Sequence, residues 1–339
     1  MRDFSARPIV VTGAAGLIGS ALIWALNRRG VEDIIAVDRL DESEKWRHLV
    51  PLRFSDYVDA DDFASLVDER PDAFGSVGTV FHLGACSSTT ERDADYLMRN
   101  NYEYTKVLAQ WAVETDVRFV YASSAATYGP LEDLLSDEID LHELRPLNMY
   151  AYSKQLFDLY AQRSGMSDRI VGLKYFNVFG PNEDHKGDMR SVVCKAYEQI
   201  RAGGSVKLFK SHRPDFRDGE QRRDFIYVKD AVEMTLAVAK SDASGLVNIG
   251  SGVAQTWVDL VRPIFAALGL PERIEFIDMP ELLRPKYQYS TQARIDRLRA
   301  CGYTAPVSAL ADAVRDYVSH YLEPGRVLDP AQHEALSLR

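Results

Sequence analysis

The chain has 339 residues, of which 46% are hydrophobic and 27% are charged, and its formal net charge at pH 7 is −10. This composition is typical of a globular protein with one large or two modest cores, and it argues against a disordered chain or a membrane protein. An acidic chain without a basic run is poorly suited to nucleic acid, although a locally basic pocket for an acidic ligand is compatible with that charge.

The three cysteines, Cys86, Cys194 and Cys301, are too few and too scattered for a disulfide framework. The polar first residues lack the apolar core of a signal peptide, so we expect a cytoplasmic protein. No spacing of Cys and His resembles a metal site, and we expect none. His82, within an apolar run, is interpreted as a satisfied residue at the end of a strand.

The N-terminal region has the pattern of a dinucleotide site. An apolar strand over Pro8–Thr12 runs into the glycine-rich segment Gly13–Gly19, which opens an amphipathic helix. A second strand over Ile34–Val37 ends at Asp38, nineteen residues after Gly19. Glycines allow the backbone to approach a pyrophosphate, the new helix binds the anion, and the acid suits a ribose hydroxyl. The alternative is an ordinary turn between a strand and a helix.

The residues after the second strand leave the choice of dinucleotide open. Asp38 favours the free 2′-hydroxyl of NAD, because its charge would repel a 2′-phosphate. Arg39 and Lys45 could instead hold the 2′-phosphate of NADP. Charges after a strand are also common as solvated loop residues.

The first half of the chain continues to alternate strand and helix. Strands are predicted over Thr79–Leu83, Arg118–Ala122 and Arg169–Leu173, and helices over Tyr102–Ala112 and Tyr150–Ser164. Such alternation predicts the α/β class, with a doubly wound, Rossmann-like parallel sheet and helices on both faces.

The pattern changes after about Lys174 to aromatic and basic loops with shorter elements. We expect a dinucleotide-binding domain over residues 1–176 and a smaller, interleaved substrate domain over most of 177–339. The segments 224–230 and 246–250 read as strands, so residues 224–250 are expected to return to the first domain. The final stretch, 324–339, is predicted to be a loosely held tail.

Tyr150 and Lys154 form the most informative pair in the chain. Their spacing places a phenol and an ammonium on one face of a helix. A free phenol has a pKa of about 10, and it becomes a useful base when nearby positive charge favours its phenolate. The pair can therefore serve redox chemistry on an alcohol, whereas the alternative is a surface helix with a half-buried tyrosine.

Several motifs together resemble the extended short-chain dehydrogenase/reductases. They are Thr12–Gly19, Tyr121–Gly129, Tyr150-x-x-x-Lys154, Tyr175–Pro181 and Arg223–Asp230. Within that superfamily, the segments 82–91, 123–129 and 185–187 resemble the ADP-L-glycero-D-manno-heptose 6-epimerases, which invert a heptose carbon for lipopolysaccharide assembly. This resemblance implies an isomerase with a tightly bound nicotinamide cofactor, for which we favour NADP over NAD. It also implies a homo-oligomer, with a pentamer as one form.

The resemblance assigns roles to four polar residues. Tyr150 would be the catalytic acid/base, Lys154 would hold the nicotinamide ribose and tune Tyr150, and Ser124 would hydrogen bond the reacting oxygen. Lys186 would be a second acid/base, although the residues alone favour a solvated charge in the loop 182–188.

The same resemblance supplies the lining of both ligand sites. The cofactor would contact Gly13, Gly16, Leu17, Ile18, Gly19, Asp38, Arg39, Lys45, Leu83, Gly84, Ala85, Cys86, Ser87, Asn100, Tyr150, Lys154, Val178 and Lys186. The nucleotide sugar would contact Asn177, Asp188, Lys195, Phe209, Lys210, Ser211, His212, Arg223 and Tyr287. Arg223 and Tyr287 match the family pattern, and a guanidinium suits a diphosphate.

Departures from the family pattern fall around the substrate and leave alternatives open. Asp188 and Lys195 stand where Ser and His are expected, and the segment 209–212 replaces a smaller, acidic one. Leu83 and Ala60 replace a common Glu and Lys, which weakens the preference for NADP. A UDP-sugar 4-epimerase and a non-catalytic cofactor-sensing protein are therefore the alternatives. A 4,6-dehydratase is disfavoured, because no acidic pair follows Ser124.

Overall fold

The computed structural model describes residues 3–281, 283–284 and 287–332, and its centre is a single parallel sheet. Seven strands lie in the order β11-β7-β5-β4-β1-β2-β3, and every neighbouring pair is parallel. In that order their bounds are Gly245–Ile249, Val171–Tyr175, Arg118–Ser124, Thr79–His82, Ile9–Thr12, Ile34–Asp38 and Asp56–Asp59. This architecture confirms the predicted fold class.

Alternating side chains along the strands build a core on each face of the sheet. Val11, Ala36, Phe81 and Val120 belong to one buried cluster. Their immediate neighbours Val10, Val37, Val80 and Phe119 belong to the other. A parallel sheet with both faces covered needs apolar residues at consecutive positions, which explains the apolar runs in the sequence.

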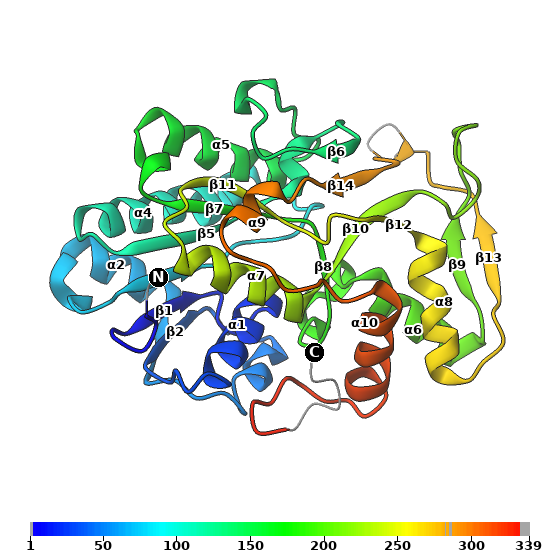
Figure 1. Ribbon diagram of the computed structural model, residues 1–339, viewed down its shortest axis with the longest axis horizontal. Helices are drawn as coiled ribbons and strands as arrows, with labels where there is room; N and C mark the ends of the chain where they lie inside the picture. Colours follow the sequence, from blue (N-terminus) through cyan, green and yellow to red (C-terminus); the bar gives the residue numbers. More distant parts are fainter. Residues whose placement is uncertain (1–2, 282, 285–286, 333–339) are drawn as a thin grey trace.

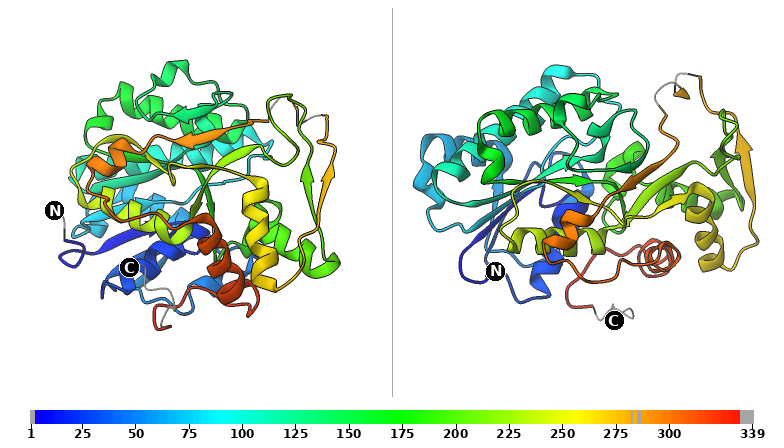
Figure 2. Two further views of the ribbon diagram at one scale, coloured as in Figure 1. Left: turned by 45° about the vertical axis from the view of Figure 1, so that its right-hand side comes forward. Right: turned by 45° about the horizontal axis from the view of Figure 1, so that its top comes forward.

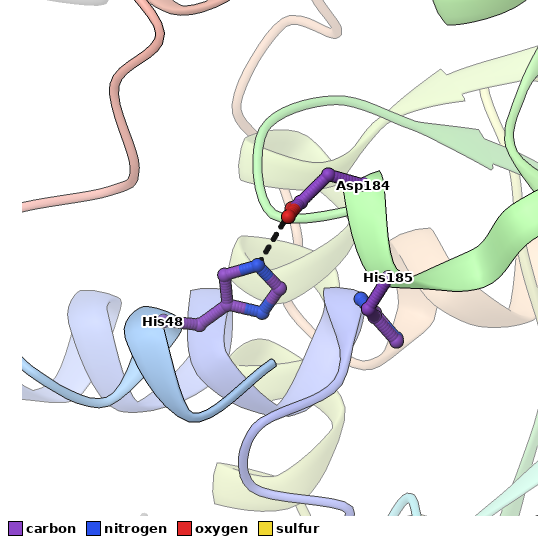
Figure 3. A group of neighbouring side chains, drawn as sticks. All are labelled: His48, Asp184 and His185. Carbon is purple, nitrogen blue, oxygen red and sulfur yellow. Dashed lines mark hydrogen bonds and ion pairs between the residues drawn. The ribbon is translucent and has the colours of Figure 1, made fainter. Parts of the chain in front are cut away.

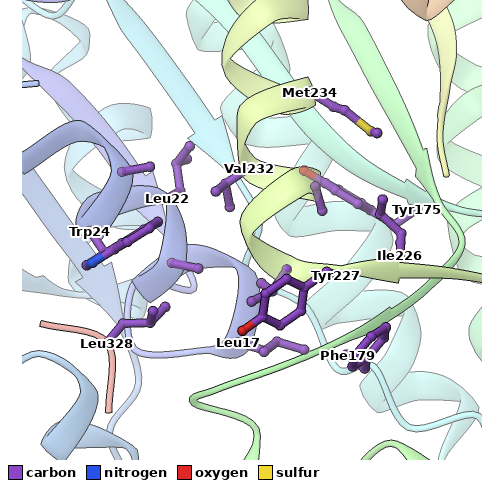
Figure 4. Close-up of a cluster of buried hydrophobic side chains, with 14 of the residues drawn as sticks. Leu17, Leu22, Trp24, Tyr175, Phe179, Ile226, Tyr227, Val232, Met234 and Leu328 are labelled. Atoms are coloured by element: carbon purple, nitrogen blue, oxygen red, sulfur yellow. The ribbon is translucent and has the colours of Figure 1, made fainter. Parts of the chain in front are cut away.

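Helices cover the two faces (Figures 1 and 2). The first face carries α1 (Leu17–Asn27) and α7 (Val228–Lys240), which pack against each other. Figure 4 shows side chains of both helices in one buried cluster, with Tyr175 of β7 beside α7. The second face carries α2 (Ala60–Glu69), α4 (Tyr104–Glu114) and α5 (Met149–Arg163).

Three small sheets lie beside the carboxyl ends of the central strands. They comprise β8 (Asn177–Phe179), β10 (Arg222–Tyr227) and β12 (Ala254–Thr256); β9 (Val206–Phe209) with β13 (Ile274–Ile277); and β6 (Asp133–Leu135) with β14 (Thr291–Ala293). The remaining α-helices are α3 (Ala94–Leu97), α6 (Val192–Gly203), α8 (Trp257–Leu268), α9 (Asp296–Ala300) and α10 (Leu310–Tyr317). Short helical turns are η1 (Glu44–His48), η2 (Pro71–Phe74), η3 (Met98–Glu103), η4 (Ala125–Tyr128), η5 (Leu141–Glu143), η6 (Met166–Asp168), η7 (Asp184–Met189) and η9 (Val318–Leu322).

Two sequence expectations differ from the structure. The strand predicted over 224–230 belongs to a small sheet and ends at Tyr227, because α7 begins at Val228. The tail is also less loose than predicted. Leu328 is fully buried beside Trp24 (Figure 4), and its N–H donates to Asn182 Oδ1 at 3.1 Å. Residues 333–339 of that predicted tail lie outside the described part of the chain.

No helix in the described ranges combines the length and the apolar character that crossing a membrane requires.

Candidate active site

The glycine-rich turn between β1 and α1 is built for close approach of the backbone. Gly13 has a φ of +66°, and a Cβ on it would lie 2.7 Å from the Gly84 nitrogen. A Cβ on Gly19 would lie 2.0 Å from the Gly13 carbonyl oxygen. Helix α1 begins at Leu17 without a side-chain cap, so its first N–H groups remain for an anion. The turn therefore fits the pyrophosphate of a dinucleotide.

Asp38 joins the end of β2 to this turn. One carboxylate oxygen accepts from the Ala15 N–H at 2.8 Å. The other accepts from the Arg39 N–H at 2.8 Å and from Lys45 Nζ at 2.9 Å. The guanidinium of Arg39 reaches across to Asp61 and to Asn100 Oδ1. Both bases are thus paired with acceptors around the position where an adenosine ribose would lie.

A cavity of about 430 Å³ extends from the turn along the carboxyl ends of the central strands. Ligands of open α/β sheets bind at this edge. Its lining includes these residues predicted from the sequence: Gly13, Gly16, Leu17, Ile18, Gly19, Asp38, Lys45, Leu83, Gly84, Ala85, Ser87, Ser124, Tyr150, Lys154, Asn177, Val178 and Lys186. Three predicted cofactor residues, Arg39, Cys86 and Asn100, are not part of this lining.

Helix α5 places the phenol of Tyr150 and the ammonium of Lys154 in the cavity. Asn148 caps the helix by accepting from the Ala151 N–H at 2.9 Å, so Tyr150 and Lys154 lie one turn apart near its start. Lys154 is buried and donates to the Ala122 carbonyl at 2.8 Å. Burial lowers the pKa of Lys154 to about 8, against the opposing charge of Asp158.

Ser124, at the end of β5, hydrogen bonds the Tyr150 oxygen. Burial raises the pKa of Tyr150 above its usual value, and the Ser124 hydrogen bond only partly opposes this. The prediction that nearby positive charge favours the phenolate applies to the site with nicotinamide bound. In the protein alone burial prevails, because Lys154 directs its ammonium to a carbonyl group.

Lys186 lies in the same cavity, on η7. It is half-buried, and burial lowers its pKa while the charge of the neighbouring Glu183 raises it. Glu183 is itself buried and accepts from the Ser191 N–H at 2.5 Å and from Ser191 Oγ at 2.6 Å. Lys186 is therefore a half-buried residue of the cavity lining and not a fully solvated loop charge, and its role as an acid/base stays a prediction.

Three of the predicted substrate residues, Phe209, Arg223 and Tyr287, lie in an aromatic cluster beside the cavity. The Arg223 guanidinium carbon lies 5.0 Å from the ring centroid of Tyr287 and 5.7 Å from that of Trp257. Trp257 lines the cavity and donates from Nε1 to Tyr287 Oη at 2.8 Å. Phe209 meets the Tyr287 ring edge-on at 6.5 Å. Burial lowers the pKa of Arg223, which remains a cation held between aromatic faces.

Of the remaining predicted substrate residues, Asn177 lines the cavity, and five others are engaged elsewhere and do not: Asp188, Lys195, Lys210, Ser211 and His212. Asp188 is exposed, and its carbonyl accepts from Lys195 Nζ. Lys210 pairs with an acid, and Ser211 and His212 donate their backbone N–H groups to Asp218 and Tyr289. The structure thus places Asn177 in the cavity lining and the other five residues outside it.

Sequence reasoning missed Asn101, a buried neighbour of the predicted Asn100. Its side chain accepts from the Cys86 N–H at 2.9 Å and donates to the Cys86 carbonyl at 3.0 Å and to Ser153 Oγ at 3.1 Å. It lies in the π-helical turn η3, a distortion often found at functional sites. Asn101 therefore ties the loop that contains Cys86 to α5.

Sequence reasoning also missed a cluster of His48, Asp184 and His185, shown in Figure 3. Their possible ligand atoms lie within 4.8 Å of one another. Positions so far apart in the chain give no local spacing to detect. His82, by contrast, is satisfied as predicted, with Thr12 Oγ1 at 2.8 Å and Thr105 Oγ1 at 2.9 Å.

The family model of the NAD dependent epimerase/dehydratase family matches residues 9–250. The chain belongs to this family. It is 52% identical, over 92% of its length and 97% of the relative's, to an ADP-L-glycero-D-manno-heptose-6-epimerase of Nitratidesulfovibrio vulgaris.

Solved structures of two epimerases have the same fold as this chain. The ADP-L-glycero-D-manno-heptose-6-epimerase of Helicobacter pylori superposes with a TM-score of 0.79 at 26% identity, covering 94% of this chain and 98% of that one. The UDP-glucose 4-epimerase of Thermus thermophilus, in complex with NAD, superposes with a TM-score of 0.75 at 26% identity, covering 92% and 98%.

Proposed function

We propose that the chain interconverts ADP-D-glycero-D-manno-heptose and ADP-L-glycero-D-manno-heptose by transient oxidation at C6. The observation that carries this proposal is the meeting of Ser124, Tyr150 and Lys186 in one cavity that also contains the glycine-rich turn. A close relative over nearly its whole length bears the name of this epimerase.

A nicotinamide dinucleotide fits the first part of the cavity. The backbones of Gly13 and Gly84 approach so closely that a Cβ on Gly13 would lie 2.7 Å from the Gly84 nitrogen, and both glycines line the cavity. The glycine-rich turn would hold the pyrophosphate, and Lys154 would hold the nicotinamide ribose. When bound, the cofactor supplies the acceptor and donor of hydride, and it is regenerated in each turnover.

We favour NADP, with NAD as the alternative. Asp38 is already engaged with Lys45 and two backbone N–H groups, which reduces its repulsion of a 2′-phosphate. Arg39 and Lys45 would provide two cations near that phosphate.

The side chains would move a proton at the sugar oxygen. Tyr150, hydrogen bonded by Ser124, takes the proton of the C6 hydroxyl while the alcohol is oxidised to a ketone. Rotation about the bond between C5 and C6 then presents the opposite face of the carbonyl, and its oxygen points elsewhere. A phenol at one fixed position serves both orientations poorly, so Lys186 would act at the second position of the oxygen.

We also propose that residues 1–176 and part of 224–250 hold the cofactor, and that 177–339 mainly hold the nucleotide sugar. Arg223 and Tyr287 would contact the nucleotide diphosphate. A UDP-sugar 4-epimerase is the second candidate. Asp188 and Lys195 depart from the family pattern, and Lys195 Nζ donates to the Asp188 carbonyl. A cytoplasmic homo-oligomer, with a pentamer as one form, completes the proposal.

The test is incubation of the purified chain with ADP-D-glycero-D-manno-heptose, beside UDP-glucose as the control. We expect the protein to convert the ADP-heptose and not UDP-glucose. Proton NMR of the product follows the conversion. Conversion of UDP-glucose alone would support the second candidate. The nucleotide released on denaturation, identified by mass spectrometry, distinguishes NADP from NAD, and light scattering gives the oligomeric state.

A further inference from the structure

His48 is a fully buried imidazole that joins two segments of the active site. It is the last residue of η1, and its Nδ1 lies 2.7 Å from the carbonyl oxygen of Ala15 in the glycine-rich turn. Its Nε2 lies 2.7 Å from Oδ1 of Asp184, the first residue of η7 (Figure 3). The ring therefore bridges the dinucleotide turn and the loop that carries Lys186.

The chemistry of Ala15 and Asp184 constrains the hydrogen bonds that the His48 ring can form with them. A carbonyl oxygen only accepts, so Nδ1 carries a proton. The hydrogen bond from His48 holds the pKa of Asp184 below its usual value, and an ionised carboxylate also only accepts. The ring thus has an oxygen of each partner at hydrogen-bond distance, one at each of its nitrogens.

The contact falls close to the second proposed acid/base. Asp184 precedes Lys186 by two residues, and on its other side Asn182 donates to Ser20 Oγ of α1 at 2.9 Å. Beyond Lys186, Gly187 has a φ of +51° and open space at its Cβ position. The loop is thus tied to the cofactor side before Lys186, and after Lys186 the Arg190 Nε donates to the Gly187 carbonyl at 2.9 Å.

A direct hydrogen bond explains the cluster better than a metal ion. An ion bound by both atoms at about 2.0–2.2 Å would hold them roughly 3 Å or more apart. His48 Nε2 and Asp184 Oδ1 are closer than that.

We propose that His48 is a positioning residue, which fixes the Lys186 loop against the dinucleotide turn so that Lys186 reaches the sugar oxygen in its second orientation. This inference rests on the proposed function of Lys186. The Lys186 ammonium has a flexible stem, and a misplacement of about 1 Å can cost up to roughly 100-fold in rate.

The experiment compares Asp184→Ala and His48→Asn, each alone and combined with Lys186→Met. Asp184 is exposed, so its variant keeps the fold even if substitution of the buried His48 does not. We expect kcat to fall about 10-fold to 100-fold in each single variant, with KM and bound cofactor unchanged. In the Lys186→Met background neither substitution should lower kcat further.

The matched control is His320→Asn. His320 also pairs with a carboxylate, Asp316 Oδ1, at 2.9 Å, and does not line the cavity. We expect it to leave kcat unchanged. Additive losses in the Lys186→Met background, or a rise in KM at constant kcat, would overturn the proposal. So would stoichiometric zinc whose removal by a chelator lowers kcat equally.

Amide hydrogen exchange separates this proposal from the proposed function. Residues 184–189 should exchange faster in Asp184→Ala than in the unsubstituted protein, whichever sugar the enzyme accepts. Unchanged exchange would show that the contact does not hold the loop and would overturn the proposal. Faster exchange in a protein inactive on the heptose would instead count against the substrate assignment.

Discussion

Tyr150 illustrates how one residue is adjusted by its surroundings. Burial raises the pKa of its phenol, and the hydrogen bond from Ser124 opposes that rise. Lys154 donates to a backbone carbonyl at 2.8 Å and would be positioned to hold a ribose. We therefore expect the phenol to become a useful base only when the cofactor and the sugar are bound.

Tyr150→Phe should lower kcat by at least about 100-fold, because the variant removes a positioned acid/base and little volume. Nicotinamide content should be nearly unchanged, since Lys154 and the glycine-rich turn remain. Steady-state kinetics and the nucleotide-to-protein ratio check both statements. Activity close to that of the unsubstituted enzyme would remove Tyr150 from the mechanism.

Lys186→Met should lower kcat on a similar scale of about 100-fold, because the thioether fills the space without holding a proton. The matched control is Lys207→Met, which replaces an exposed lysine on β9 and should leave kcat unchanged. Equal activity of the two variants would return Lys186 to the role of a loop charge.

At the scale of elements, the turn from β1 to α1 depends on the absence of side chains. Gly19→Ala would place a Cβ 2.0 Å from the Gly13 carbonyl oxygen, so the backbone must move. We expect a loss of about 1–3 kcal/mol in the free energy of unfolding, together with loss of bound nicotinamide. Urea unfolding and nucleotide analysis measure the two effects.

Gly203→Ala is the control for that substitution. Gly203 lies at the end of α6, and a Cβ there would meet open space. Because alanine has a higher helix propensity than glycine, Gly203→Ala should stabilise the protein by up to about 1 kcal/mol without changing cofactor content. A Gly19 variant that behaves like this control would contradict the role of the turn.

His82 links three elements, because it joins Thr12 of β1 and Thr105 of α4 from the end of β4. Burial lowers its pKa to about 3 in the folded state, against about 6.5 in the unfolded chain. The unfolded state therefore binds the extra proton first, and stability that is present above pH 6.5 is lost as the pH falls toward 3.

From pH 7 to pH 5 this linkage should cost about 2 kcal/mol of unfolding free energy, with other groups adding their own dependence. His82→Asn should show a pH dependence smaller by about that amount, although it is less stable at neutral pH. Urea unfolding at the two pH values measures the difference. If the unfolding free energy of both proteins depended equally on pH, His82 would not be the source of this pH dependence.

At the scale of the whole molecule, the cavity lies between the central sheet and the smaller sheets around β8 and β10. Phe225, Trp257 and Leu260 line it from the second side, opposite the glycine-rich turn. The first side would bind a dinucleotide and the second a nucleotide sugar. The reaction carbon would meet both only inside this cavity, away from bulk water.

Epimerisation in deuterium oxide should therefore place no deuterium on C6 of the heptose, because a transferred hydride never exchanges with solvent. If Tyr150 or Lys186 instead abstracted the C6 hydrogen as a proton, that proton would exchange before its return. Mass spectrometry of the product distinguishes the two routes. One extra mass unit at C6 in most molecules would refute the hydride route, and retention of substrate deuterium at C6 would support it.

The sequence by itself determined the features that local patterns encode. Apolar runs alternating with amphipathic helices specified the parallel sheet, since both of its faces must be covered. The spacing of Gly13 to Gly19, and of Tyr150 to Lys154, specified which side chains share one turn or one helix face. Boundaries were less secure, because α7 begins within the strand predicted over 224–230.

Only the tertiary structure decided which distant residues meet. Lys186 has the sequence context of a solvated loop charge, and the folding of η7 over the cavity makes it a lining residue. His48 and Asp184 are separated by 136 positions, and no local period reports their hydrogen bond. The pKa of Tyr150 likewise depends on burial, which is a property of packing between elements that a short stretch of sequence does not contain.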